Sequence, residues 1–281
     1  MPNRLPDLER RLQGAVRRHW TYRLDQLGRA SELPFWRVRV PPRGRLHTRV
    51  CLAAGIHGDE PAGLEAILRL IETGAFPHGV AVDCFPCMNP AGWLAGTRGD
   101  GVVDDLNRTF DVDSPPAPVT WFRSAVESQP YDLYIDLHED SRAEGFYLFE
   151  LERGEAPLGP AIAEAVAQSG RPLAAPDHLK HLIEDDGFDQ AYGPFRLEPG
   201  LALPGLKELP AGGLPQAAYM ALCRNVHALT LETPAGEPLE TRVAMHQVGV
   251  SAIFDRLKAR SRFATLNPAR EWVASEPWGR R

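Results

Sequence analysis

Histidine and carboxylate side chains stand at the ends of three predicted strands. The segment Gly-Ile-His-Gly-Asp-Glu at residues 55–60 directly follows an apolar run, and His138 and Glu232 each end a further apolar run. Two imidazoles and one carboxylate are a ligand set that suits zinc, with the fourth position left to water. His57, Glu60 and His138 are therefore candidate metal ligands. Two hydrogen-bonded strand-end histidines without a metal would give the same spacing.

A polar segment between these motifs carries paired amide and guanidinium donors. Asn89 follows a predicted strand, Arg98 comes nine residues later, and Asn107 and Arg108 stand in the run Asp-Leu-Asn-Arg-Thr-Phe. Forked or paired N–H donors of this kind fit a carboxylate and an oxyanion that develops during a reaction. A solvated loop would explain the charge of the segment but not this grouping. The segment is therefore a candidate anion-binding wall.

Taken in order, these motifs resemble the signature of the zinc carboxypeptidases, a group that also includes aspartoacylase and succinylglutamate desuccinylase. The shared features are Gly-Ile-His-Gly-Asp-Glu, Asn-Pro-x-Gly, an Arg, Asp-Leu-Asn-Arg-x-Phe, Asp-Leu-His and a late Glu on a strand. The match spans residues 51–233, which is most of the chain. The resemblance implies one bound Zn²⁺ per chain and three protein ligands: His57, Glu60 and His138. It also implies a general base, two substrate-carboxylate anchors and an oxyanion donor: Glu232, Asn107, Arg108 and Arg98.

The resemblance implies a zinc-dependent metallocarboxypeptidase that hydrolyses the C-terminal peptide bond of short peptides, with Glu232 as general base. An alternative is an N-acyl amino acid amidohydrolase of the aspartoacylase and desuccinylase branch. That branch has a sizeable β domain after its catalytic Glu, whereas 49 residues follow Glu232 here, which favours the carboxypeptidase. Arg224 is a candidate second carboxylate anchor, so the deacylase stays open. A metal-binding or regulatory module without turnover is a third hypothesis, which the intact Glu232 disfavours.

Two features depart from the carboxypeptidase pattern. Family carboxypeptidases carry a mobile Tyr well before the catalytic Glu, whereas Tyr219 and Tyr192 lie 13 and 40 residues before the candidate base here. Neither tyrosine is assigned that role. Glu139 and Asp140 follow the second candidate His, where carboxypeptidases often have Ser or a small residue. This extra negative charge could tune metal affinity, attract a basic substrate or form a solvated turn.

Three further groups have competing interpretations. The acidic run at residues 184–189 could line a pocket for a Lys or Arg side chain, although such runs are usually solvated loops. His178, His181 and Glu184 have the spacing of a helical metal cluster, but no strand end positions them. Cys84-Phe85-Pro86-Cys87 mimics a redox motif, and its position in and after a strand favours buried structural thiols.

Strand patterns that alternate with helix patterns predict an α/β fold. The resemblance implies a mixed, mainly parallel sheet flanked by helices on both faces. Five strands are expected, at residues 35–40, 48–54, 80–85, 131–137 and 227–231. Helices are expected near residues 5–16 and at 61–72, 119–127, 160–169, 214–224 and 239–258. A turn is expected at residues 41–45 and irregular structure at residues 171–213. The expected segments are an N-terminal helical extension, a zinc-hydrolase catalytic domain and a C-terminal tail, at residues 1–33, 34–262 and 263–281.

The composition is that of an ordinary globular protein, with 281 residues, 43% hydrophobic and 24% charged, which excludes a disordered or collagen-like chain. Because no apolar run could span a membrane and no signal peptide is visible, a cytoplasmic protein with four reduced Cys is expected. Residues 1–50 contain 12 Arg against four acidic residues. An amphipathic helix with a solvated Arg face explains this excess better than nucleic-acid binding, since aromatics at stacking spacing are missing. The oligomeric state is left open.

Overall fold

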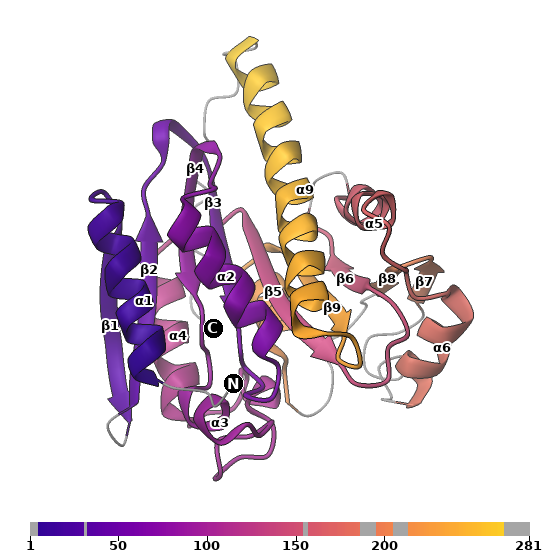
Figure 1. Cartoon of the computed structure of the whole chain (residues 1–281), viewed down its shortest axis with the longest axis horizontal. Coiled ribbons are helices and arrows are strands. Elements are labelled where there is room, and N and C mark those ends of the chain that lie inside the picture. Colours follow the sequence, from indigo (N-terminus) through magenta and orange to yellow (C-terminus); the bar gives the residue numbers. More distant parts are fainter. Residues whose placement is uncertain (1–4, 31–32, 154–156, 186–194, 205–212, 267–281) are drawn as a thin grey trace, which may run out of the picture.

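The structure is a computed structural model that describes residues 5–30, 33–153, 157–185, 195–204 and 213–266 (Figure 1). A nine-stranded sheet has the strand order β1-β2-β4-β3-β5-β9-β6-β8-β7. The strands are β1 (Arg23–Ala30), β2 (Leu33–Val40), β3 (Arg43–Ala54), β4 (His78–Phe85), β5 (Leu133–Asp140), β6 (Tyr147–Leu151), β7 (Phe195–Glu198), β8 (Leu201–Pro204) and β9 (His227–Pro234). The helices are α1 (Leu5–Arg18), α2 (Pro61–Thr73), α3 (Pro90–Ala95), α4 (Ala117–Glu127), α5 (Gly159–Gln168), α6 (Pro176–Asp185), α8 (Gln216–Ala218) and α9 (Leu239–Leu266), with short turns η1 (Leu106–Arg108) and η2 (Tyr219–Cys223).

Parallel strands form the centre of the sheet. β4, β3, β5 and β9 run in one direction, and the register sets Ala54 beside Leu137 and His138 beside Glu232. Antiparallel pairs lie on both sides, because β2 pairs with β4 and β6 pairs with β9. The predicted mixed sheet is confirmed, with four neighbouring parallel strands at its centre. The carboxyl ends of these strands meet at one edge, where sites in such sheets lie.

Helices cover both faces of the sheet, as predicted. On one face, α1, α2 and α9 contribute Leu12, Ile67 and Val250 to one hydrophobic cluster. Figure 1 shows α2 and α9 crossing this face next to each other. On the other face, Phe122 of α4 packs against Phe85 of β4, with ring centroids 4.9 Å apart. Burying a large apolar side chain contributes roughly 1.5–3 kcal/mol, so two such layers hold the central strands firmly in place.

The structure contains several elements that the apolar patterns do not predict. β1, β6, β7, β8, α3 and α6 are additional, and α6, β7 and β8 make residues 171–213 less irregular than expected. The expected turn at residues 41–45 is wrong in part, because β3 begins at Arg43. Within the expected N-terminal extension, the helix ends at Arg18 and β1 then pairs with β2. The domain boundaries after residues 33 and 262 stay predictions.

The described residues include no helix with both the length and the apolar character that crossing a membrane requires. Cys51, Cys84 and Cys87 are buried free thiols, and Cys223 is exposed. Burial raises the pKa of Cys87 to about 12 and raises the pKa of Cys84 as well. Both thiols therefore stay protonated at neutral pH, which agrees with a structural rather than a redox role.

Candidate metal centre

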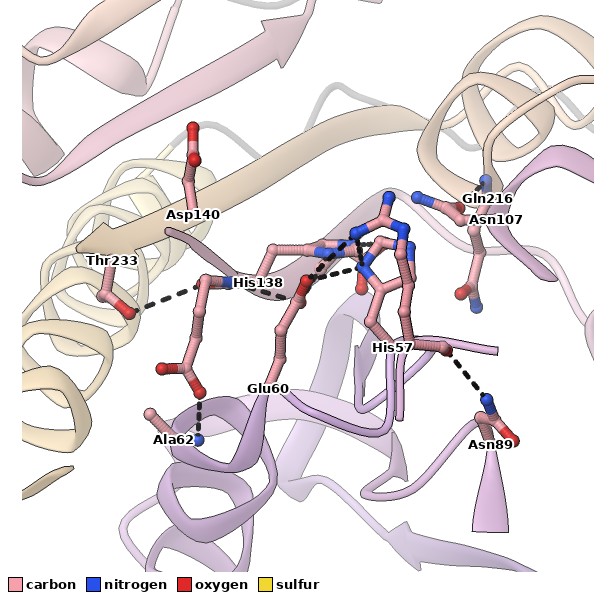
Figure 2. Close-up of polar contacts among 12 residues, drawn as sticks. His57, Glu60, Ala62, Asn89, Asn107, His138, Asp140, Gln216 and Thr233 are labelled. Carbon is pink, nitrogen blue, oxygen red and sulfur yellow. Dashed lines mark hydrogen bonds and ion pairs between the residues drawn. The ribbon is translucent and has the colours of Figure 1, made fainter. Parts of the chain in front are cut away.

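Three ligand atoms converge at the carboxyl edge of the central strands, and Figure 2 shows His57, Glu60 and His138 turned toward one another. Nδ1 of His57 lies 2.6 Å from one carboxylate oxygen of Glu60, and Nδ1 of His138 lies 2.9 Å from the other. The three ligand atoms lie within 4.8 Å of one another, and all three side chains are buried. Across the described ranges, no other group of three His, Cys, Asp or Glu side chains could hold a metal ion.

The loop from β3 to α2 reaches this position through two glycines. Gly55 has a φ of 68°, a left-handed conformation that a residue with a Cβ rarely adopts. A Cβ at Gly58 would lie only 1.9 Å from the carbonyl carbon of Gly92, so the loop passes directly against the start of α3. The glycines of the motif therefore serve close backbone approach, which places His57 and Glu60 at the end of β3.

A carboxylate faces the far nitrogen of each imidazole. Asp105 Oδ1 lies 3.1 Å from Nε2 of His57. Asp136 Oδ2 lies 3.2 Å from Nε2 of His138, although the angles of this second contact are not those of a hydrogen bond. An Nε2–H directed at a carboxylate leaves the Nδ1 lone pair for a metal. Both aspartates belong to the sequence motifs, but the spacing of the motifs does not reveal this role.

The electrostatics of the cluster separate its two glutamates. Burial raises the pKa of Glu60, but the neighbouring His138 and His57 lower it further, to about 2. Burial lowers the pKa of His138, but Asp136 and Glu60 together raise it well above its ordinary value. Burial raises the pKa of Glu232 well above its usual range, and His138 opposes this only in part. Glu60, a candidate ligand, is thus ionised, whereas Glu232 has the greater affinity for a proton.

The predicted anion-binding residues surround the same space. Nη1 of Arg98 lies 3.3 Å from Nδ1 of His57, and its Nη2 donates over 2.9 Å to the aspartate that faces this imidazole. Asn107 is buried, and its Oδ1 accepts a hydrogen bond from the backbone N–H of Gln216 over 2.8 Å. Nη1 of Arg108 donates to the carbonyl oxygen of Asn107 over 3.0 Å. The structure therefore brings these three residues to the candidate ligands.

A cavity of about 440 Å³ joins these groups. One end holds the candidate ligands, the anion-binding residues and the candidate base: His57, Glu60, His138, Arg98, Asn107, Arg108 and Glu232. Another part of the lining is largely apolar and comes from β6, β8 and the start of α8: Tyr147, Phe149, Leu151, Pro204, Pro215, Ala217 and Ala218. Further polar residues also line the cavity: Asp59, Asp136, Glu139, Asp140, Ser141, Arg142 and Thr230. Because β6 pairs antiparallel with β9, Tyr147 lies opposite Glu232 and Phe149 lies opposite Thr230. The cavity thus combines a charged end with an apolar wall.

One tyrosine lines the described part of the cavity, and it is not one of the two that the sequence suggested. Tyr219 packs in the core of the other face, where its hydroxyl donates to Glu127 over 3.3 Å, and Tyr192 lies outside the described residues. Tyr147 on β6 lines the cavity and donates to Asp140 over 2.9 Å. The alternation of Tyr147, Phe149 and Leu151 is a signal that could have identified this strand.

Other sequence candidates lie away from the centre. Arg224 donates to the carbonyl oxygen of Val126 and does not line the described cavity, so the expected second carboxylate anchor is not placed there. Glu184 on α6 is exposed and lies 3.7 Å from Lys180. The rest of the acidic run from residue 186 lies outside the described residues. His178, His181 and Glu184 do not assemble into a metal cluster in the described part of α6.

Known proteins match part of this chain in sequence. Residues 47–178 match the family model described as the succinylglutamate desuccinylase/aspartoacylase catalytic domain. Carboxypeptidase D of Homo sapiens is 29% identical over 139 residues, which is 40% of this chain and 10% of that protein. The match thus spans about a tenth of the length of this curated relative.

Solved structures share the fold over most of the chain. A candidate metallopeptidase from Shewanella denitrificans has a TM-score of 0.69 at 18% identity and covers 91% of both chains. A metallo-carboxypeptidase from Burkholderia cenocepacia has a TM-score of 0.61 at 18% identity, over 89% of this chain and 68% of that one. Carboxypeptidase A from Helicoverpa armigera has a TM-score of 0.59 at 13% identity, over 89% and 72%. The carboxypeptidase-like fold is therefore confirmed.

The sequence match of residues 47–178 and the shared fold support the zinc carboxypeptidase-like group, which includes the desuccinylase and aspartoacylase branch, as the group that this chain resembles. The resemblance that the motifs suggested is thus confirmed at the level of this group of hydrolases. The cluster of His57, Glu60 and His138 agrees with a metal-dependent member of the group.

Proposed function

We propose that the protein is a zinc-dependent metallocarboxypeptidase that removes the C-terminal residue of short peptides. One observation supports this proposal above the others. A metal-ligand cluster, a carboxylate of raised pKa and two candidate carboxylate anchors share one cavity of about 440 Å³. This combination matches what the hydrolysis of a terminal peptide bond requires. The cleaved bond needs an activated water, and the free carboxylate needs a cationic partner.

The residues of the cluster fit a zinc ion. Each imidazole has one nitrogen facing a carboxylate and the other facing Glu60, which leaves Nδ1 of His57 and Nδ1 of His138 directed at a common point. Two nitrogen ligands and one carboxylate oxygen are a usual zinc set. Zinc held there would act as a Lewis acid on the scissile carbonyl and would lower the pKa of a water molecule.

Glu232 is the proposed general base. It stands beside His138 in the sheet and lines the cavity, so its carboxylate can take a proton from the attacking water. The same group can then return the proton to the leaving amine. Proton transfer by a positioned side chain typically contributes about 10²–10⁴-fold to the rate.

Asn107 and Arg108 are the proposed anchors for the terminal carboxylate of the substrate. The backbone hydrogen bond from Gln216 to Asn107 fixes this amide beside the apolar wall of the cavity. Arg98 stands against the ligands and can stabilise negative charge on the reacting carbonyl oxygen, as oxyanion donors do. The side chain of the released residue would then face the apolar wall, so we expect Phe and Leu to be preferred over Lys and Arg.

The test measures metal content and hydrolysis on the same sample. Purified protein is analysed by elemental mass spectrometry and incubated with short peptides that end in Phe, Leu, Lys, Arg, Asp or Glu. We expect one zinc per chain and release of a single C-terminal residue. Glu232→Gln should keep its zinc and lose about 10²–10⁴-fold in kcat. The matched control is Glu237→Gln, an exposed glutamate just after β9, which should behave like the native protein. Zinc-loaded protein that cleaves none of the peptides would contradict the proposal.

The second candidate is an N-acyl amino acid amidohydrolase. The observation in its favour is the match of residues 47–178 to the succinylglutamate desuccinylase/aspartoacylase catalytic domain. N-acetylaspartate and N-succinylglutamate are therefore added to the peptide panel. Consumption of either compound, with every peptide left intact, would assign the protein to this branch. Zinc binding without turnover of any compound would instead favour a binding or regulatory module.

A further inference from the structure

A buried ion pair lies next to the candidate metal ligands. Glu139 follows His138 on β5, and its carboxylate contacts the guanidinium of Arg242 on α9. The side chains of Glu139 and Arg242 are only 1% and 13% exposed. Arg242 stands in the first turn of α9, where the helix dipole disfavours a positive charge. A buried charge in an unfavourable place points to a function beyond surface solvation.

The start of α2 explains what Glu139 does. Glu60 occupies the N-cap position of this helix but makes no side-chain capping hydrogen bond, because its two oxygens face His57 and His138. Glu139 takes over the capping, and its Oε1 accepts a hydrogen bond from the backbone N–H of Ala62 over 2.6 Å. A capping side chain normally comes from the N-cap residue itself. Here the neighbouring strand supplies it, which leaves Glu60 available for a metal.

A second contact joins Glu139 to Glu60 itself. The backbone N–H of Glu139 donates to Oε2 of Glu60 over 3.1 Å, and this oxygen is the one that faces His138. The side chain of Glu139 therefore holds the start of α2, and its backbone holds the carboxylate of Glu60. The relative position of Glu60 and His138 depends on both contacts. Arg242 neutralises the carboxylate of Glu139, which makes the contact with the backbone N–H of Ala62.

We propose that Glu139 and Arg242 are positioning residues, which set the separation of Glu60 and His138 and thereby the strength of metal binding. The inference rests on the proposed function only in requiring that the site binds a divalent metal. Outer-shell partners of metal ligands are typically worth 10–100-fold in metal affinity, and a partner that holds a carboxylate ligand belongs to this range.

The test uses four variants of the pair, of which Arg242→Lys keeps both charges, and one matched control. Arg242→Met leaves the Glu139 carboxylate buried without its cation. Glu139→Gln keeps an oxygen that can accept from Ala62 but leaves Arg242 without its anion. The double variant Glu139→Gln/Arg242→Met removes both charges. The control, Arg69→Met/Glu240→Gln, removes a more exposed ion pair between α2 and α9, in which Nη2 of Arg69 lies 2.8 Å from Oε1 of Glu240.

Zinc affinity is measured by competition with a chelator, starting from metal-free protein, and the visible absorption of cobalt-loaded protein reports ligand geometry. We expect each single variant to bind zinc about 10- to 100-fold more weakly, with a changed cobalt spectrum. The double variant should recover part of the affinity, because no buried charge is left unpaired, and Arg242→Lys should recover part of it by keeping the charge. The control should bind zinc as the native protein does.

The thermal unfolding of the metal-free variants separates positioning from simple stabilisation. If every variant binds zinc with native affinity and a native cobalt spectrum, while only the unfolding temperature falls, the pair is structural and the inference is wrong. If the single variants do not fold, the double variant and Arg242→Lys carry the same comparison. Native protein that binds zinc but hydrolyses nothing would contradict the proposed function and leave this inference intact. Native protein that binds neither zinc nor cobalt would overturn both.

Discussion

Asp105 offers a sharp test of the metal centre, because one carboxylate makes three contacts there. Its Oδ1 accepts hydrogen bonds from Nε2 of His57 over 3.1 Å and from the backbone N–H of Asn107 over 2.8 Å. Its Oδ2 accepts a hydrogen bond from Arg98 over 2.9 Å. Since a carboxylate that orients a metal-bound histidine is typically worth 10–100-fold in affinity, we expect Asp105→Ala to weaken zinc binding by about 1.4–2.7 kcal/mol.

Asp105→Asn separates the contacts of this carboxylate. The amide oxygen of Asn can still accept from His57 and Asn107, whereas its NH₂ group replaces the oxygen that holds Arg98. Zinc affinity should therefore fall less in Asp105→Asn than in Asp105→Ala. Hydrolysis should fall in both variants, because the oxyanion donor is no longer held against the ligands.

The assay combines chelator competition for zinc with kcat and KM on the best peptide of the panel. Asp100→Ala is the matched control from the same loop. Its carboxylate accepts from the backbone N–H groups of Val102 and Val103 and makes no contact with His57 among the described hydrogen bonds. If Asp105→Ala binds zinc as tightly as Asp100→Ala and the native protein, then Asp105 does not orient His57 and the reasoning is refuted.

Two further predictions concern residues that the sequence did not assign. Tyr147→Phe should keep its zinc and lose about 2- to 10-fold in kcat/KM, which corresponds to one hydrogen bond of about 0.5–1.5 kcal/mol. Tyr219→Phe should not affect hydrolysis. Equal effects of both changes on kcat/KM would contradict a role for Tyr147 in the cavity. In the native protein a thiol reagent at pH 8 should label Cys223 first, because this thiol is exposed. The three other cysteines should react only after denaturation, because burial hides the sulfur atoms of Cys51, Cys84 and Cys87 and raises their pKa well above that of a free thiol. Rapid labelling of more than one thiol per native chain would show that one of these sites is open.

The central strands and the helices between them could be predicted from the sequence, because each is a continuous apolar segment with clear ends. α2 shows this well, since Pro61 marks its first turn and Gly74 ends it with a φ of 67°. The candidate ligands were equally accessible to prediction, because strand-end positions bring His57, Glu60 and His138 to one edge of any parallel sheet.

The part of the cavity lined by β6 could not be predicted, because it depends on which strands are neighbours in the sheet. β6 has only five residues, and one of them is Glu150, a charged residue that is buried because it accepts hydrogen bonds from His227 and from the start of α5. The alternation of its apolar residues indicates a strand, but the sequence does not reveal that this strand pairs with β9. The partners of Glu139 and Asp105 were equally hidden, since Arg242 and His57 lie far away in the sequence and meet them only in the fold.

The position of β9 explains why one cavity has two chemically different walls. β9 runs parallel to β5 on one side and antiparallel to β6 on the other. The parallel neighbour brings His138, at the carboxyl end of β5, beside Glu232, while the antiparallel neighbour brings Tyr147, at the amino end of β6, to the same edge. The candidate metal ligand His138 and the apolar strand β6 therefore reach Glu232 from opposite sides of β9. A change of strand direction at β9 thus places the candidate base between them.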